Sequence, residues 1–216
     1  MHDPRRIGKG FDILAPIYDA CVWLIFGNSL TKFQSESIVN LESVDVCAIV
    51  GGGTGKILQT ALARNMAKKF YYVEASPRMH EMTKKRLDSL ERSHVHHVYS
   101  IEEINESVNL ILFPFILDCY TDESVKRLLA SAASRLSERG KIVVMDFNAE
   151  NIGAMRPKWR QRMFISILYI PFRMVGGVQT STLPKIDTLL RSFFTRVTIT
   201  HSIRGGWIMT WLASKE

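Results

Sequence analysis

Apolar runs and amphipathic stretches alternate along the chain, and their order predicts its secondary structure. Runs rich in Val, Ile and aromatic residues, apolar along their length, are typical of strands buried on both faces of a parallel sheet. Amphipathic stretches between them favour helices. The expected strands are 46–50, 69–75, 95–99, 108–113, 141–147, 197–203 and 207–213, and the expected helices are 16–41, 56–64, 77–91, 122–138 and 184–194.

This alternation predicts an α/β fold, a doubly wound and mostly parallel seven-stranded sheet with helices on both faces. Only Arg204, Gly205 and Gly206 join the last two strands, which is enough for a hairpin but too short for a crossover helix. The last strand should therefore run antiparallel. Gly140 follows the predicted helix 122–138 and is expected as its C-terminal cap.

Length and composition indicate one domain. A chain of 216 residues, 46% of them hydrophobic, can bury one full core. Within it we expect an N-terminal helical cap, a central core, a lid or substrate segment, and a last helix with the closing hairpin. These four parts cover 1–43, 44–150, 151–182 and 183–216.

Three scattered cysteines without a C-x-x-C pair indicate neither a disulfide framework nor a zinc site, and favour a reducing, cytoplasmic setting. Asp12 and Asp19 interrupt the first apolar segment, so we expect no signal peptide. The longest apolar run, 163–172, is about ten residues, whereas a membrane span needs about 20. In the run 94–97, His-Val-His-His, neighbouring side chains of a strand point to opposite faces, so we expect no metal site.

The net charge of +7 is concentrated in the C-terminal third. Residues 151–216 carry 10 Lys and Arg against 2 Asp and Glu, while residues 1–150 carry 18 against 19. A basic excess of this kind attracts anionic partners such as lipid headgroups, nucleic acid or acidic substrates. Solubility alone would account for it equally well.

A glycine cluster follows the first predicted strand, with four of the thirteen glycines at 51–55. A P-loop is nearly excluded, because Gly51 lies one residue too close to Gly55 and Ile57 stands where a magnesium-binding hydroxyl is required. A dinucleotide fingerprint is disfavoured, because Lys56 stands where its third glycine belongs. The G-x-G-x-G that is present lets a ligand approach the backbone, and the following helix N-terminus suits a carboxylate as well as a phosphate.

The second predicted strand ends in an acid. Glu74 lies 19 residues after Gly55, the distance at which a carboxylate accepts hydrogen bonds from both hydroxyls of a ribose. Alternatively, Glu74 only caps the helix that begins at Pro77, although Ser76 is the better cap residue.

Four segments together resemble a known family: FDILAPIYD at 11–19, VGGGTG at 50–55, VEASPRMHE at 73–81 and RGGWIMTWLASK at 204–215. They are similar to the class I S-adenosylmethionine-dependent methyltransferases, which have a Rossmann-like fold. Within that superfamily they most resemble the ubiquinone and menaquinone C-methyltransferases and the methyltransferase type 11 group. The resemblance implies S-adenosyl-L-methionine as cofactor.

The resemblance also assigns residues. Those implied in cofactor binding are Gly51, Gly53 and Gly55 for the methionine part, Glu74 for the ribose, Ala75 and Met79 around the adenine, Ser100 near the adenine amino group, Tyr18 over the sulfonium, and Phe113 at the end of its strand. Two positions depart from the family pattern. Ile49 and Ser100 stand where the family usually or often has an acid, and either change could mark a chain that binds the cofactor without turnover.

A base at the mouth of the sheet would help methyl transfer to an oxygen, a nitrogen or an activated carbon. Asp118 and Tyr120 are the candidate catalytic residues, with Asp146 a further acid at the end of the fifth strand. Each has a structural alternative as a turn, cap or core residue. The run Phe-Pro-Phe-Ile at 113–116 does not resemble the amino-group methyltransferases of nucleic acids, since it lacks their Asn or Asp, and this pattern disfavours a nucleic-acid substrate.

The segment 154–178 is apolar and aromatic with cations at its edges, namely Arg156, Lys158, Arg160, Arg162 and Arg173. This pattern is typical of an interfacial element or of a lid over a greasy substrate, although an ordinary packed helix would also show it. Residues 18–27 have the same character and could close the pocket from the other side. We therefore expect methyl transfer to a small hydrophobic or lipid-like acceptor: a quinol precursor, a lipid headgroup or an aromatic metabolite. Peripheral contact with an anionic membrane would accompany it. The alternative is a cofactor-binding adaptor that works through the basic C-terminal region.

Overall fold

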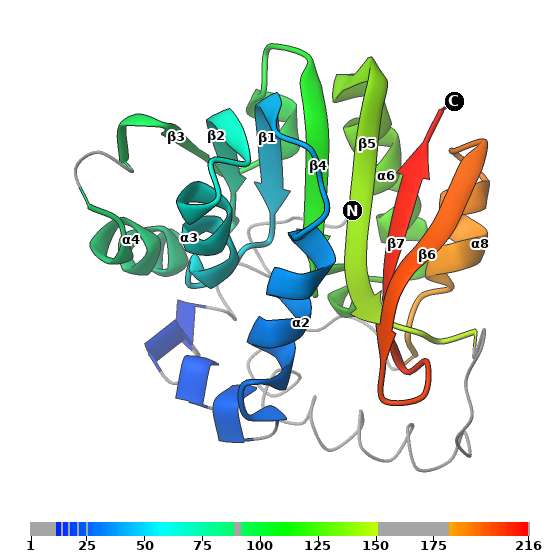
Figure 1. Cartoon of the computed structure of the whole chain (residues 1–216), viewed down its shortest axis with the longest axis horizontal. Coiled ribbons are helices and arrows are strands. Elements are labelled where there is room, and N and C mark those ends of the chain that lie inside the picture. The colour runs from blue at the N-terminus through cyan, green and yellow to red at the C-terminus, as the bar shows by residue number, and fades with distance from the viewer. Residues whose placement is uncertain are drawn as a thin grey trace.

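A seven-stranded sheet forms the centre of the protein (Figure 1). The structure is a computed structural model that describes residues 12–13, 15–16, 18–20, 22–24, 26–88, 92–150 and 182–215. The strand order is β3-β2-β1-β4-β5-β7-β6. The strands are β1 Val44–Val50, β2 Ala67–Val73, β3 Val95–Val98, β4 Val108–Pro114, β5 Leu136–Phe147, β6 Arg196–Ile203 and β7 Ile208–Ser214.

The predicted fold class is confirmed. Strands β1 to β5 pair in parallel, while β7 pairs antiparallel with both β5 and β6. The turn between β6 and β7 uses left-handed backbone at Arg204, Gly205 and Gly206, with φ values of 54°, 67° and 81°. Short connections through such residues suit a hairpin. The strand that closes the sheet is therefore antiparallel, as the short connection required.

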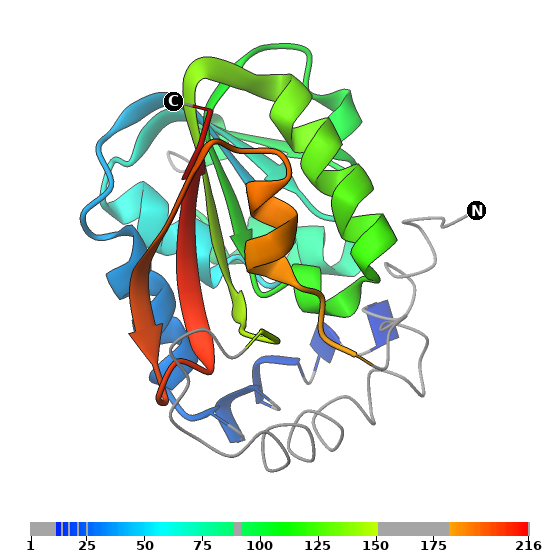
Figure 2. The ribbon, with the colours of Figure 1, turned by 90° about the vertical axis from the view of Figure 1, so that its right-hand side faces the viewer.

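Helices cover both faces of the sheet (Figure 2). The described helices are α2 Ser29–Ile38, α3 Lys56–Ala63, α4 Pro77–Arg86, α6 Asp122–Arg135 and α8 Ile186–Arg191, with 3-10 turns η1 Ile101–Glu103 and η2 Leu117–Cys119. Alternation along β1 divides the core between them. Cys47 and Ile49 pack in the cluster that contains residues of α2 and α3, whereas Ala48 and Val50 pack with residues of α6 and α8.

The predicted helix 122–138 is confirmed from Asp122 to Arg135, but its predicted end and the cap at Gly140 are wrong. Helix α6 ends at Arg135, and β5 begins at the next residue. Leu136 has extended dihedral angles, is buried and pairs with Val108 of β4. Its burial in the sheet outweighs the helical preference of the residues that follow, and Gly140 lies inside β5. A Cβ at Gly140 would lie 2.6 Å from the Leu136 Cγ.

The predicted N-terminal helix 16–41 is interrupted. Gly27 has a φ of +58° and separates α2, Ser29–Ile38, from the described residues between 16 and 26, which are also helical. A residue with left-handed backbone ends a helix, and glycine adopts that conformation without steric cost. The predicted lid 151–182 lies, except for Thr182, outside the described residues, and the division of the chain into four parts stays a prediction. None of the described helices is long and apolar enough to cross a membrane.

Candidate functional site

The glycine turn lies at the carboxyl end of β1, between the carboxyl ends of β2 and β4. Gly51 donates its N–H to the Val73 carbonyl over 2.8 Å, which fixes the turn against β2. Gly53 has a φ of +61°, and among the described residues a Cβ there would meet only the Tyr18 ring, at 3.7 Å. The backbone at Gly53 therefore faces open space that a side chain would fill, which is how a glycine turn accepts a ligand.

Glu74 reaches this turn from the carboxyl end of β2. Its Oε2 accepts the Gly53 N–H over 3.2 Å, and its Oε1 accepts the Ser76 N–H over 3.1 Å. Burial raises the pKa of Glu74 to about 7, although the hydrogen bonds from Ser76 and Gly53 oppose the rise. Ser76 caps α4 by accepting the Met79 N–H, so the helix does not depend on Glu74 for its cap.

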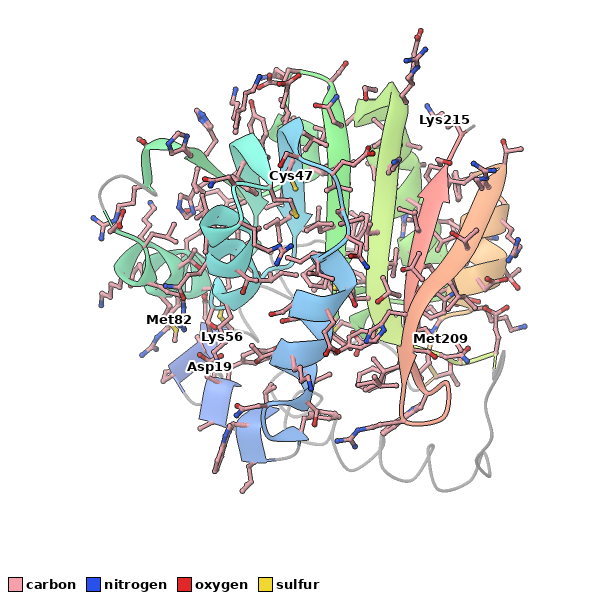
Figure 3. All side chains as sticks on the ribbon, in the orientation of Figure 1. Asp19, Cys47, Lys56, Met82, Met209 and Lys215 are labelled. Carbon is pink, nitrogen blue, oxygen red and sulfur yellow. The ribbon has the colours of Figure 1, made fainter. Side chains whose placement is uncertain are left out.

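The N-terminal segment, meaning the described residues between 12 and 26, lies over the glycine turn. Two aspartates, Asp12 and Asp19, hold it there. Asp19 accepts a hydrogen bond from the Thr54 hydroxyl over 2.8 Å, and pairs with Lys56 at 3.2 Å and with Arg86 at 3.1 Å. Figure 3 shows Asp19 and Lys56 side by side at the start of α3. Asp12 contacts the start of α4, where its carboxylate accepts the Arg78 N–H over 3.2 Å. These contacts attach the segment to the starts of both helices that follow the turn.

A small apolar cavity of about 80 Å³ lies between this segment and the sheet. Tyr18, Val22 and Phe26 recur every four residues and line one wall of it with Leu30. The remaining lining residues are Gly51, Gly53, Glu74, Met79, Phe115, Ile116, Asp118, Cys119 and Phe147. A second cavity of about 60 Å³ lies beside it, and Tyr18 borders both.

The turn η2 brings Asp118 to the cavity, and Asp146 holds that turn. The Asp146 Oδ2 accepts the N–H groups of Leu117 and Asp118 over 3.0 and 3.2 Å, while its Oδ1 accepts the Phe147 N–H over 2.7 Å. Asp146 is fully buried, and this burial, followed by the charge of Asp118, raises its pKa well above the usual range. Its contacts assign Asp146 to positioning η2.

Six of the eleven predicted site residues line the cavity: Tyr18, Gly51, Gly53, Glu74, Met79 and Asp118. Others lie elsewhere. Gly55 packs against α4, since a Cβ there would lie 2.7 Å from the Thr83 Cγ2. Phe113 is fully buried in the core, and Tyr120 is half-buried against both apolar clusters. Ser100 accepts the Glu102 N–H and caps η1.

Ala75, the remaining predicted residue, is half-buried directly after Glu74. Several lining residues were not predicted, namely Leu30, Phe115, Ile116, Cys119 and Phe147. Four of them follow or end β4 and β5 at the edge where the glycine turn lies. Their position past the strand ends is the signal that would have found them, because their apolar character alone reads as core.

The histidines of 94–97 make pairwise contacts. The His97 Nδ1 lies 2.9 Å from the His80 Nδ1, and the His80 Nε2 lies 2.8 Å from the Glu74 carbonyl oxygen. Because a carbonyl only accepts, the His80 Nε2 carries hydrogen, and a neutral His80 then accepts from His97. Within the described ranges no group of three metal-ligating side chains is present.

Solved structures of methyltransferases match the chain, although no protein-family model and no curated protein does. Human N-acetylserotonin methyltransferase, in complex with S-adenosylmethionine, matches with a TM-score of 0.64 at 15% identity over 95% of this chain and 58% of that one. An O-methyltransferase family protein from Burkholderia thailandensis gives 0.65 at 13% over 95% and 58%. Magnesium protoporphyrin IX methyltransferase from Synechocystis, with S-adenosylhomocysteine bound, gives 0.63 at 15% over 99% and 100%.

The chain has the fold of these methyltransferases. It spans 58% of the length of the human and Burkholderia structures and the whole length of the Synechocystis one. At identities of 13 to 15% these structures show that the chain shares their fold, and no more. The function has to be inferred from the side chains at the glycine turn.

Proposed function

We propose that this chain is an S-adenosylmethionine-dependent methyltransferase that acts on a small, apolar acceptor. One observation carries the proposal: the open backbone of Gly53 and the buried carboxylate of Glu74 face one apolar cavity at the carboxyl ends of the strands. Ligands of doubly wound sheets bind at that edge. The matching structures with bound S-adenosylmethionine or S-adenosylhomocysteine support the same cofactor here.

The residues present fit that cofactor. Glu74 is buried and offers two oxygens to the ribose hydroxyls, and the space at Gly53 admits the chain that joins ribose to amino acid. Tyr18 presents an aromatic ring beside Gly53, where a sulfonium would be attracted to its face. When bound, S-adenosylmethionine supplies a methyl group on a sulfur that is already a leaving group. The chain's own task is then to orient the two reactants and to exclude water.

The cavity favours an apolar acceptor. The Phe147 ring lies at the cavity with its centroid 6.1 Å from that of Phe26 and 5.7 Å from that of Phe115, and Val22 and Leu30 also line the cavity. Such a lining suits a planar or greasy molecule, as in a quinol precursor, an aromatic metabolite or the tail of a lipid. Two matching structures are named for N-acetylserotonin and magnesium protoporphyrin IX, both aromatic molecules. The similarity of the sequence to the quinone C-methyltransferases favours a quinol precursor among these acceptors.

Other parts of the function remain predictions. A cytoplasmic protein with peripheral contact to anionic membrane fits the basic C-terminal third of the sequence. Asp118 or Tyr120 as a base is the prediction from sequence, and the buried position of Asp118 at the cavity supports the first over the second.

Calorimetry with S-adenosylmethionine, S-adenosylhomocysteine, NAD and ATP tests the cofactor. We expect micromolar binding of the first two and no binding of the others. Glu74→Ala should weaken binding by about 1.5 to 3 kcal/mol, the loss expected for hydrogen bonds to a charged group. Glu81→Ala, which removes an exposed acid of helix α4, is the matched control and should change nothing.

Turnover is then measured as S-adenosylhomocysteine released in the presence of quinol, phenol and lipid acceptors. Release with any of them supports the enzyme. Tight binding of S-adenosylhomocysteine with no release from any acceptor class would favour a binding protein, as the departures at Ile49 and Ser100 allow. If wild type binds neither S-adenosylmethionine nor S-adenosylhomocysteine, the proposed function is wrong.

A further inference from the structure

A histidine of α4 binds the main chain of Glu74. His80 is buried, and its Nε2 donates to the Glu74 carbonyl oxygen over 2.8 Å. Helix α4 does not need this bond in order to begin, because Ser76 caps it by accepting the Met79 N–H over 3.1 Å. The hydrogen bond from His80 therefore acts on the residue that follows β2 rather than on the start of the helix.

The ring of His80 is held in one orientation and one tautomer. The Nδ1 of His97, from β3, lies 2.9 Å from the His80 Nδ1, which leaves the hydrogen of His80 on Nε2. The rings of Tyr72 and Tyr99 stand edge-on to His80, with centroids 5.7 and 4.8 Å from its own. Burial lowers the pKa of His80, and burial followed by the charge of His80 lowers the pKa of His97 to about 4. Both rings are therefore neutral at pH 7.

The hydrogen bond from His80 sets the plane of the peptide group between Glu74 and Ala75. A trans peptide group is planar, and its carbonyl and N–H point in opposite directions. Burial raises the pKa of Glu74, and backbone hydrogen bonds, one of them from Ala75, act against the rise. The Ala75 N–H thus faces the Glu74 carboxylate, while the carbonyl of the same peptide group faces His80. A rotation of this peptide group would disturb both contacts.

We propose that His80 is a positioning residue for the cofactor: it fixes the peptide group between Glu74 and Ala75, and thereby orients the Glu74 carboxylate toward the ribose hydroxyls. This inference rests on the proposed function and deepens it. His80 is not among the residues that line the described cavity, so it acts on the ligand through Glu74. His97 acts one step further back, because it holds the tautomer of His80.

Two amide variants of one residue test this. The amide of His80→Gln can reach the position of the imidazole Nε2 and donate to the Glu74 carbonyl, whereas the shorter amide of His80→Asn reaches only the position of Nδ1. Both variants are compared with wild type for binding of S-adenosylhomocysteine and of its analogue in which hydrogen replaces both ribose hydroxyls. His96→Asn, which alters an exposed histidine of β3, is the matched control. Thermal unfolding of each variant shows that it is folded before binding is measured.

We expect His80→Asn to bind S-adenosylhomocysteine about 3- to 10-fold more weakly than wild type, as for loss of one neutral hydrogen bond. His80→Gln and His96→Asn should stay within twofold of wild type. Binding of the analogue should change less than twofold in every variant, because it has no hydroxyl for Glu74 to bind. Equal weakening in both His80 variants, equal weakening for both ligands, or unchanged binding in His80→Asn would each overturn the inference.

The pair His97→Leu and His97→Asn makes the same comparison if His80→Asn does not fold, since only asparagine can donate to the His80 Nδ1. Weaker binding of S-adenosylhomocysteine in His97→Leu alone supports the inference, and equal binding in the two overturns it. The proposed function is tested by wild type by itself. Failure of wild type to bind S-adenosylhomocysteine would reject that function, whereas a wild type that binds it and His80 variants without the expected difference would reject only the role of His80.

Discussion

Replacing Glu74 by glutamine tests the site without any acceptor. Glutamine cannot ionise, so the variant removes the part of the stability that depends on pH; its amide nitrogen also cannot accept one of the N–H groups of Gly53 and Ser76, a loss that is the same at every pH. In the folded chain the pKa of Glu74 is about 7, against an ordinary value of 4.5. Glu74 as a residue is 8% exposed, so solvent screens this difference little. Each pKa unit corresponds to about 1.36 kcal/mol, so ionising Glu74 costs the folded protein about 3 kcal/mol.

The direction in which the free energy of unfolding changes with pH follows from the linkage between proton binding and folding. A pKa that is higher in the folded chain means that the folded state holds the proton more tightly. The stability from Glu74 is therefore fully present below pH 4.5 and is lost as pH rises through about 7. Glutamine never ionises, so the Glu74→Gln variant does not lose this stability as the pH rises. Between pH 5 and 8 the free energy of unfolding of the variant should rise relative to wild type by about 2.5 kcal/mol.

Urea unfolding of both proteins at pH 5, 6, 7 and 8, without ligand, measures this difference. Glu81→Gln, on the exposed side of helix α4, is the control, and its difference from wild type should not follow pH in this way. Binding should show the reverse dependence, because the ribose hydroxyls need the charged carboxylate. Below about pH 7 the dissociation constant of S-adenosylhomocysteine should rise toward tenfold per pH unit in wild type, but not in Glu74→Gln. A stability difference that is constant with pH would refute the reasoning about burial.

Three further results are expected. Gly53→Ala should abolish cofactor binding in calorimetry while costing only about 1 to 2 kcal/mol of stability, since its Cβ enters the cavity; Gly55→Ala should lose more stability because its Cβ collides with α4. Asp146→Asn should lower the free energy of unfolding by about 1 to 3 kcal/mol, because an amide cannot accept all three N–H groups, and an unchanged denaturation midpoint would contradict this. The wild type should sediment with anionic vesicles more than with neutral ones, and added salt should release it. The double variant Arg160→Glu with Arg162→Glu should stay in solution. Equal and negligible sedimentation of all samples would reject the membrane contact.

The sheet could be predicted because the strands at its centre, β1 and β4, contain short apolar runs, and amphipathic helices alternate with most of the strands. Local signals also located the cap of α4, where Ser76 precedes Pro77. The boundary at Leu136 could not be predicted, since the choice between helix and strand depends there on pairing with β4, a contact distant in sequence. Helical preference is a weak force against such burial.

Some residues of the candidate site could also be predicted from the sequence, and others could not. That Glu74 and Gly53 lie together could be predicted, because a ribose and a close backbone approach would demand these residue types at this spacing, and the structure brings the two into contact. Phe115 and Phe147 were not, because a phenylalanine that lines a cavity is indistinguishable in sequence from one that fills a core. Asp19 was visible in the sequence as part of a motif, but its three partners come from two other helices and their flanking residues.

The wall formed by the N-terminal segment has a consequence for the kinetics of exchange. The two cavities beside Tyr18 measure about 80 and 60 Å³, whereas sites for small molecules usually measure about 300 to 1,000 Å³. A nucleoside cofactor therefore enters only after this wall moves outward, and the apparent affinity is lowered by the fraction of molecules that are closed. The ion pairs of Asp19 with Lys56 and Arg86 are partly exposed, so salt weakens them. Higher ionic strength should thus speed both entry and departure of the cofactor, and the rate of product release becomes a property of one partly exposed carboxylate.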